Sequence, residues 1–309
     1  MNIVVFGASG YIGSHLVEKL LCAGHDVCAL VHRGKGLLTS NSINHNHITI
    51  KKIDICNPQS VKNACKLADK IINLSSNAVP QSSNKDPKSD LQVNLIGALN
   101  IFDAAKDSKG KNVIMISSGG TVYGKPQALP INEKHPTQPI CSYGITKLAI
   151  EKYLYLYKKI HNINGLALRI SNPYGGAQRI NHQQGVIPNF LQKSIKNEVI
   201  QIWGDGNIVR DFIYISDVID AIISALNYTG DDHVINIGSG HGYSLLEIIK
   251  LIEIISEKKV AYTTSSQRIS DVDINILDIK KAKLLLNWEP KITIKEGLKL
   301  YYKKILSCN

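Results

Sequence analysis

Two residues in the stretch SYGITK have the types and the spacing needed to move a proton. Tyr143 and Lys147 stand four residues apart near the start of a segment with helical periodicity, Tyr143–His161, so they share one face of a helix. A lysine ammonium near a phenol favours the phenolate and lowers the pKa of the tyrosine. Such a tyrosine can take a proton from a sugar hydroxyl, or return one to a ketone, while a nicotinamide carries the hydride. The pair also occurs by chance on exposed helix faces, so it gains meaning only behind a dinucleotide site.

Three glycines near the N-terminus have the spacing of a dinucleotide-binding turn. Gly7, Gly10 and Gly13 form GASGYIG between an apolar run, Asn2–Phe6, and an amphipathic stretch, Tyr11–Ala23. In such a turn the first glycine permits the tight bend, the second lets a pyrophosphate approach, and the third lets the helix pack close to the strand. The phosphates would face the free N–H groups and positive dipole end of the helix. A flexible loop also uses glycines, but a preceding strand and a following helix favour the dinucleotide interpretation.

The end of the second apolar run, Val27–Val31, lacks the carboxylate that usually binds the ribose hydroxyls of NAD. His32 and Arg33 follow it. Arg33 could pair with a 2′-phosphate, which favours NADP. Alternatively, Arg33 is a surface residue and NAD is held by other contacts. Asp54 and Ile55, just after the third predicted strand, would suit an adenine contact, and the expected cofactor is NAD or NADP.

Strand and helix signals alternate through the first half of the chain. Gly24 follows the first predicted helix at the place where a left-handed residue is favoured. Asn57 and Pro58 have the character of an N-cap and first residue of a helix that runs to about Asp69. The remaining predicted strands and helices are Ile48–Ile53, Lys70–Leu74, Asp90–Lys109, Asn112–Ser117, Tyr143–His161 and Gly165–Ile170. This alternation is typical of an α/β fold with a doubly wound parallel sheet, the Rossmann type.

A smaller C-terminal region is expected after Asn172, where glycines and prolines shorten the elements. Ser244 and Glu247 form a capping box before an apolar helical run. The other elements predicted here are Phe212–Ile215, Asp217–Asn227, His233–Ile237, Leu245–Ile255, Lys280–Leu286 and Ile294–Leu306. We therefore divide the chain into a dinucleotide-binding domain, residues 1–172 with 209–237 returning to it, and a substrate-binding region, residues 173–208 and 238–309.

Composition narrows the class of protein. Hydrophobic residues make up 44% and charged residues 20% of 309 residues, which excludes a disordered or low-complexity chain. No apolar run reaches the roughly 18 residues of a membrane span, and MNIVVFGASG reads as a strand start rather than a signal peptide. We expect a cytoplasmic protein without a membrane partner.

The net charge of +11 could indicate nucleic-acid binding, but the lysines are dispersed, so an anionic small substrate is the better expectation and no nucleic acid is predicted. The six cysteines show no CxxC spacing and are expected to be reduced thiols. No combination of cysteine and histidine has the spacing of zinc ligands, so no metal site is predicted.

Nine stretches occur in the order typical of one family. They are GASGYIG, DICN, DLQVNLIGALNIFDAAK, ISSGGTVYG, SYGITKLAIEKYL, LRISNPYG, GDGNIVRDFIYISDV, NIGSG and LDIKKAKLLLNWEP. In nearly its whole length the chain resembles an extended short-chain dehydrogenase/reductase, in the NAD-dependent epimerase/dehydratase group that includes UDP-glucose 4-epimerases.

The resemblance implies roles for the cofactor side of the site. Tyr143 would be the catalytic acid/base, and Lys147 its partner that also holds the nicotinamide ribose. Asn94 and Ser117 would line the cofactor. The full predicted cofactor site is Gly7, Gly10, Tyr11, Ile12, Gly13, His32, Arg33, Asp54, Ile55, Leu74, Asn94, Ser117, Tyr143 and Lys147.

The resemblance also implies a substrate side and a partner. Asn172 would contact a nucleotide-diphosphate sugar, Arg210 and Arg268 would bind its phosphates, and Tyr123 would line the sugar. In such proteins the helices corresponding to residues 90–109 and 143–161 form a four-helix interface, so a homodimer is expected. Tyr153, Tyr155 and Tyr157 would serve that interface, although plain packing explains them too.

One position departs from the family. The third residue of the segment before VYG is usually a serine or threonine that hydrogen-bonds the reacting sugar oxygen, and here it is Gly119. Ser118 or Thr121 could substitute, a water could do so, or the substrate could sit differently. We favour Thr121 by proximity, so Thr121 and Ser118 join Tyr143 and Lys147 as catalytic candidates.

The sequence thus favours a nucleotide-sugar 4-epimerase of the UDP-hexose type that oxidises C4 transiently with a bound nicotinamide cofactor. The alternative is an NADPH-dependent 4-keto reductase of a dTDP- or GDP-4-keto-6-deoxy sugar, which Arg33 and Gly119 make more credible. A third alternative is a non-catalytic dinucleotide-binding protein, against which the intact Tyr143 and Lys147 argue.

Overall fold

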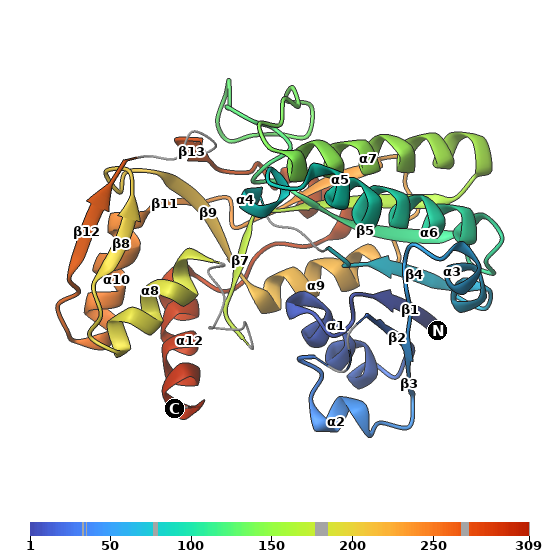
Figure 1. Ribbon diagram of the computed structural model, residues 1–309, viewed down its shortest axis with the longest axis horizontal. Helices are drawn as coiled ribbons and strands as arrows, with labels where there is room; N and C mark the ends of the chain where they lie inside the picture. Colours follow the sequence, from blue (N-terminus) through green and yellow to red (C-terminus); the bar gives the residue numbers. More distant parts are fainter. Residues whose placement is uncertain (33, 35, 77–79, 177–184, 267–271, 309) are drawn as a thin grey trace.

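The computed structural model describes residues 1–32, 34, 36–76, 80–176, 185–266 and 272–308. Figure 1 shows a larger part that contains the N-terminus and a smaller part that contains β8, α10 and the C-terminal helix. Within the described residues, no helix is long and apolar enough to cross a lipid bilayer.

The larger part is built on a sheet whose described strands number seven, all parallel. Across the sheet they are β10 (Val234–Ile237), β6 (Asn164–Ile170), β5 (Asn112–Ser118), β4 (Lys70–Asn73), β1 (Asn2–Phe6), β2 (Asp26–Val31) and β3 (Ile48–Lys52). The central strands are buried along nearly their whole length because helices cover both faces. The doubly wound parallel sheet predicted from the sequence is confirmed.

Helices form a layer on each face of this sheet (Figure 1). One face packs against α1 (Tyr11–Cys22), α9 (Ile215–Ala225) and α11 (Lys280–Leu286), and the other against α3 (Pro58–Cys65), α6 (Gly97–Lys106) and α7 (Ser142–His161). Short helices α2 (Ser40–Ile43), α4 (Pro80–Ser83) and α5 (Pro87–Asp90) lie in the connections. The two apolar layers bury the sheet and hold the ends of its strands in register.

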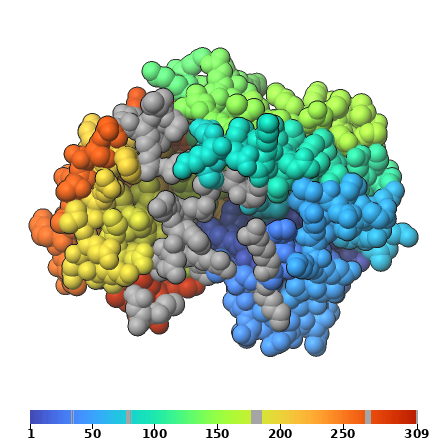
Figure 2. All heavy atoms as spheres, viewed as in Figure 1, coloured from blue at the N-terminus to red at the C-terminus, as the bar shows by residue number. Residues whose placement is uncertain are grey.

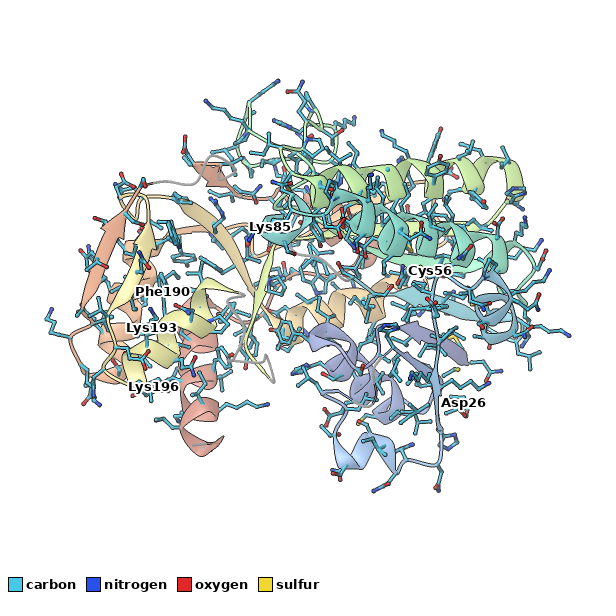
Figure 3. All side chains as sticks on the ribbon, viewed as in Figure 1. Asp26, Cys56, Lys85, Phe190, Lys193 and Lys196 are labelled. Carbon is cyan, nitrogen blue, oxygen red and sulfur yellow. The ribbon has the colours of Figure 1, made fainter. Side chains whose placement is uncertain are left out.

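The smaller part has its own core. Strand β9 (Val209–Tyr214) pairs with β7 (Asn172–Tyr174), β11 (Gly242–Ser244) and β13 (Ile274–Asn275), and β8 (Ile200–Trp203) pairs with β12 (Tyr262–Ser265). Helices α8 (Val186–Ile195), α10 (Leu245–Ser256) and α12 (Ile294–Cys308) pack on these strands. On α8, Phe190 is buried, whereas Lys196, the residue just after the helix, is exposed; both are labelled in Figure 3.

Two sequence predictions about elements are corrected. Helix α3 ends at Cys65 rather than near Asp69. The expected continuous helix over 90–109 is divided into α5, the π-helical segment η1 (Leu91–Ile96) and α6. Helix α6 begins at Gly97, where an added side chain would come within 2.9 Å of the Ile55 side chain, so the helix backbone lies close to Ile55 at this point.

The division into two regions also differs from the prediction. Strand β9 belongs to the smaller sheet, so the return to the large sheet begins with α9 and β10 rather than at residue 209. Helix α11, predicted in the substrate-binding region, packs with α9 and β10 instead, and Trp288 Nε1 donates to the carbonyl of Asp217. Periodicity predicts which face of an element is apolar but not which of two cores it joins.

Candidate active site

The glycine turn after β1 is built as a phosphate-binding turn requires. Gly7 has φ of +74°, and a side chain there would come within 2.8 Å of the backbone nitrogen of Ser75. A side chain on Gly13 would clash with the carbonyl oxygen of Gly7. Helix α1 begins after Gly10 without a side-chain cap on its first N–H groups, which leaves them available for an anion.

The turn lies at the switch point of the sheet. Strands β1 and β4 are neighbours, although the chain visits β2 and β3 between them. The carbonyl of Leu74, just after β4, lies against Gly7. Ligands of open α/β sheets bind at the carboxyl ends of strands at such a point. Tyr11, Ile12 and Leu74, predicted to contact the cofactor, therefore stand at this edge.

The predicted adenosine side is partly described. His32 is exposed after β2, whereas Arg33 lies outside the described residues. Asp54 accepts a hydrogen bond from the backbone N–H of Cys56 at 2.9 Å. Ile55 is buried, and its carbonyl accepts from the Asn100 side chain at 2.9 Å. Asp54 and Ile55 are thus held rigidly at the end of β3, next to the first turn of α6.

Tyr143 and Lys147 come together on the first turns of α7. The Lys147 ammonium lies 5.5 Å from the centre of the Tyr143 ring and donates to the carbonyl of Ile116 at 2.9 Å. Ile116 belongs to β5, so the lysine bridges the helix and the sheet. Lys147 is only 5% exposed. The spacing alone predicted this shared face, and the carbonyl of β5 fixes the lysine on it.

Burial changes the titration of both groups. Burial lowers the pKa of Lys147 to about 8, while the carboxylates of Asp90 and Glu151 act in the opposite direction. Burial raises the pKa of Tyr143, and Asp90 and then Cys141 add to this rise. The expectation that Lys147 brings the pKa of Tyr143 down is not met by the protein's own groups, because the loss of water and the facing acids outweigh the ammonium.

The start of α7 is held by side chains from the connection after β4. Helix α7 has Cys141 at its N-cap position, with no cap from that side chain. Instead, the backbone N–H of Ser142 donates to Asn84 Oδ1 at 2.8 Å, and that of Tyr143 donates to Ser83 Oγ at 3.0 Å. These bonds satisfy N–H groups that the helix itself leaves open. Sequence reasoning missed Ser83 and Asn84, because their partners lie about sixty residues away.

Ser117 has a different partner from the one predicted. Its hydroxyl donates to Glu151 Oε1, and Glu151 also accepts from Arg169 Nε at 2.9 Å and Nη2 at 2.6 Å. Glu151 and Arg169 are 2% and 4% exposed. This buried pair braces α7 against β5 and β6, one turn beyond Lys147. Ser117 therefore belongs to the support of the site, and its contact with the cofactor stays a prediction.

The segment before VYG explains the missing hydroxyl in steric terms. A side chain on Gly119 would lie 2.5 Å from Leu277 Cδ1, so a serine or threonine at this position would require the buried Leu277 side chain to shift. Thr121 Oγ1 is buried and, among the described atoms, has no hydrogen-bond partner. The carbonyl of Thr121 lies against Gly144, beside Tyr143. The carbonyl of Ser118 accepts backbone bonds from Thr121 and Val122, and the choice of Thr121 over Ser118 stays a prediction.

The predicted substrate residues do not all meet at one place. Tyr123 is 1% exposed and donates to Asn236 Oδ1 at 2.6 Å, so it packs in the core, and we do not carry it into the substrate site. Asn172 Nδ2 donates to the carbonyl of Asp211 at 2.9 Å. Arg210 Nη1 donates to the carbonyl of Val272 at 2.7 Å.

These last two residues stand on β7 and β9, where the two parts of the molecule meet. Arg268 lies outside the described residues. Figure 2 shows a recess between the yellow atoms of the smaller part and the blue atoms of the larger part, with N-terminal atoms at its floor. In the part of the chain that the structure describes, no three His, Cys, Asp or Glu side chains gather as metal ligands would.

The sequence model of the NAD dependent epimerase/dehydratase family matches residues 3–238. The chain belongs to this family. The match runs from β1 to just after β10, and so includes the whole large sheet and all the catalytic candidates named above.

Curated members of the NAD dependent epimerase/dehydratase family are similar over most of the chain. A putative UDP-glucose 4-epimerase of Methanocaldococcus jannaschii is 35% identical over 96% of this chain and 96% of its own length. A dTDP-4-dehydro-6-deoxyglucose reductase of Escherichia coli is 37% identical over 76% of this chain and 74% of its own length.

Solved structures agree with the fold over its full length. A UDP-glucose 4-epimerase of Thermotoga maritima with UDP-glucose has a TM-score of 0.92 at 32% identity, covering 100% of this chain and 99% of that chain. A UDP-glucose 4-epimerase of Thermus thermophilus with NAD has a TM-score of 0.90 at 26% identity, covering 100% of both. The arrangement of sheet, helices and smaller region is therefore that of the epimerase/dehydratase family.

Proposed function

We propose that this chain is a UDP-hexose 4-epimerase that oxidises and reduces the sugar at C4 with a resident nicotinamide cofactor. The observation that carries the proposal is the pair Tyr143 and Lys147, fixed at the carboxyl edge of the sheet that also holds the glycine turn. The similarity to UDP-glucose 4-epimerases over the full length supports the substrate class.

The chain's own residues handle the proton at C4. Tyr143 takes the proton of the C4 hydroxyl and returns it to the C4 oxygen after the 4-keto sugar has turned over. Lys147 stabilises the phenolate during the interval, since its ammonium is 5.5 Å from the ring and is held by Ile116. Thr121, whose hydroxyl is buried beside this helix turn, donates to the C4 oxygen. The nicotinamide, when bound, supplies the site that accepts and returns the hydride.

The cofactor fits the residues that would hold it. The first turn of α1 offers uncapped N–H groups, and Gly7 and Gly13 leave no room for side chains between the turn and its neighbours. We assign NAD rather than NADP because a similar enzyme was solved with NAD. Lys147 would hold the nicotinamide ribose and Asn94 would line the cofactor, as the family resemblance implies.

The substrate side is assigned more coarsely. Asn172 and Arg210 stand on the paired strands β7 and β9, and a guanidinium can anchor a diphosphate while the sugar turns over. Arg268 is a further candidate for the diphosphate. We expect the protein to act in the cytoplasm, and this stays a prediction.

We infer that the active form is a homodimer. Exposed apolar side chains follow one face of α7 at spacings of eight, three and four residues: Ile145 is 53%, Tyr153 39%, Leu156 44% and Ile160 59% exposed. On the neighbouring segment η1, the side chains of Leu91 and Ile96 are 41% and 38% exposed. Such a stripe on neighbouring helices fits a second copy of the same face.

The other two tyrosines predicted at the interface, Tyr155 and Tyr157, have partners within the chain. The Tyr157 hydroxyl donates to Asp103 at 3.1 Å, and the Tyr155 ring lies 4.6 Å from that of His233. Of the three tyrosines named for the interface, Tyr153 is therefore the one that we assign to it.

The 4-keto reductase remains the second candidate, because a dTDP-4-dehydro-6-deoxyglucose reductase is 37% identical over three quarters of the chain. The two activities differ in how they use the cofactor. An epimerase regenerates it in each cycle, whereas a reductase consumes NADPH and must exchange it.

The first experiment is to denature the purified protein and identify the nucleotide that it releases. We expect about one NAD per chain, together with interconversion of UDP-glucose and UDP-galactose, followed by NMR, without added cofactor. Tyr143→Phe should abolish the interconversion and still release NAD. An empty protein, or one that releases NADP and reduces a dTDP-4-keto-6-deoxy sugar with NADPH, would replace the epimerase proposal with the reductase.

A further inference from the structure

A buried carboxylate beside Tyr143 has no role in the mechanism described so far. Asp90, the last residue of α5, is 1% exposed. Its Oδ1 accepts from Asn94 Nδ2 at 2.6 Å, and its Oδ2 accepts from Ser142 Oγ at 3.0 Å and Thr146 Oγ1 at 2.7 Å. A buried carboxylate is retained only where donors of this kind compensate its loss of water.

The donors belong to residues that flank the reacting groups. Ser142 precedes Tyr143, and Thr146 precedes Lys147. Asn94 lies in the π-helical segment η1, and such segments frequently occur at functional sites. One carboxylate thus joins the helix that carries the acid/base to the segment that carries the predicted cofactor residue. Lys85, labelled in Figure 3, lies between α4 and α5, the two short helices that contact α7.

Asp90 is also a charge that both reacting groups face. It opposes formation of the Tyr143 phenolate, after burial and ahead of Cys141, and so helps to keep the pKa of Tyr143 high. It favours the ammonium of Lys147, as Glu151 does from the next turn of α7. Glu151 is itself neutralised by its ion pair with Arg169 of β6. The donors to Asp90 named above are all neutral, so none of them cancels its charge.

We propose that Asp90 is a positioning residue that fixes the first turns of α7 against η1 and sets the charge that Tyr143 and Lys147 face. The proposal rests on the acid/base role of Tyr143 in the proposed function. Its carboxylate holds Ser142, Thr146 and Asn94 in one arrangement. Together with burial, its negative charge keeps Tyr143 protonated until a cationic nicotinamide is in place, and so ties proton removal to an occupied cofactor site.

Removing the charge while keeping the shape tests the electrostatic part. Asp90→Asn in the NAD-loaded protein should move the acidic limb of the pH dependence of kcat to lower pH, by about one pH unit. Asp86→Asn is the matched control, because Asp86 is an exposed acid on the same connection that caps α5 through the N–H of Ser89, and asparagine caps equally well. Its profile should overlay the wild type.

A spectroscopic titration separates this proposal from the proposed function. Tyrosinate absorbance near 295 nm in the protein loaded with oxidised cofactor, with the equally loaded Tyr143→Phe protein subtracted, reports Tyr143 without any turnover. The Tyr143 step should come at lower pH in Asp90→Asn than in the wild type. A step at the same pH, no step in either protein, or an equal shift in Asp86→Asn would overturn the electrostatic role, even if the chain proves to be a reductase.

The positioning part is tested while the charge is kept. The double variant Ser142→Ala, Thr146→Val removes two donors to Asp90 and leaves its carboxylate in place. We expect kcat to fall about tenfold, since small misplacements of reacting groups are costly, with KM within twofold and the pH midpoint unmoved. An unchanged kcat would overturn the positioning role. This variant also keeps the proposal testable if Asp90→Asn does not fold.

Discussion

Lys147 and Asp211 are both buried ionisable side chains, but the two regions around them differ in the hydrogen bonds that they offer to the charge. Lys147 is 5% exposed and donates to the carbonyl of Ile116. Asp211 is 0% exposed, and its carboxylate accepts the backbone N–H groups of Ser239 at 2.7 Å and Gly240 at 3.2 Å, along with other donors. Burial lowers the pKa of Lys147 to about 8, whereas burial raises the pKa of Asp211 and its hydrogen bonds pull it back.

The difference separates a residue of the proposed active site, Lys147, from a residue that stabilises the fold, Asp211. The Asp211 clasp, formed by Asp211, Ser239, Gly240 and Leu277, uses the charge to join β9, the turn after β10 and the segment after β13. Its backbone donors would be orphaned without the carboxylate. Lys147 keeps its charge available for a cofactor and a reacting oxygen, which costs stability. The variants below test this contrast.

The largest effect is expected at Lys147. Lys147→Met should lower turnover about a thousandfold without loss of the fold. Because the folded pKa of about 8 lies below the unfolded value near 10.4, the buried charge costs stability below pH 8, and this cost is relieved as pH rises between the two values. The melting temperature of the variant should therefore exceed that of the wild type at pH 6.5, and the difference should be smaller at pH 9.5. A variant less stable than the wild type at pH 6.5 would contradict the contrast.

The opposite outcome is expected at the clasp. Asp211→Asn places an amide N–H against backbone donors and should lower the free energy of unfolding by about 3 kcal/mol. Turnover per folded molecule should change far less than in Lys147→Met. Urea unfolding measures the loss, with Asp205→Asn as control, because Asp205 is exposed and its bond to the N–H of Asn207 is one that asparagine can also form. Equal free energies of unfolding for the two variants would contradict the structural role assigned to Asp211.

Restoring the family's hydroxyl should not restore its function. In Gly119→Ser the new side chain meets Leu277 Cδ1 at 2.5 Å, and we expect about 2 kcal/mol of destabilisation from overpacking with no gain in kcat. Gly120→Ser is the matched control, since the nearest atom to a side chain there, Ser118 Oγ, is 4.0 Å away. A more active Gly119→Ser enzyme would show that the Leu277 side chain yields and that Thr121 is not the working hydroxyl.

The smallest effect is expected far from both regions, at the start of α10. Ser244→Ala removes the bond from the Glu247 N–H and should cost about 1 kcal/mol. Hydrogen bonds from Ser244 lower the pKa of Glu247, so the support from this glutamate is present above its unfolded pKa and lost as pH falls through the folded value. Ser256→Ala at the other end of the helix should change stability by less than about 0.5 kcal/mol. Equal losses would exclude capping as the cause.

Local signals predicted most of the elements and the reacting pair. The capping box of Ser244 and Glu247, the left-handed residue at Gly24 and the N-cap at Asn57 are all confirmed. Tyr143 and Lys147 lie on one helix face because four residues span about one turn. These features depend on residues within one turn of each other, which is why the sequence reveals them.

Only the tertiary structure decided the supports of that pair. Asp90 and Ser83, from the connection after β4, accept hydrogen bonds from the start of α7. Glu151, further along α7, is held by Arg169 of β6. Sequence patterns assigned α11 to the wrong core, because an apolar stripe does not say which surface it will meet.

The same distinction explains the site. Composition and spacing determined that this chain would form a doubly wound sheet with a glycine turn and a tyrosine–lysine helix. The exclusion of a hydroxyl at Gly119 depends on Leu277, and the high pKa of Tyr143 depends on burial and Asp90. Steric exclusion and burial arise only when distant segments pack together, so the chain's own sequence order could not disclose them.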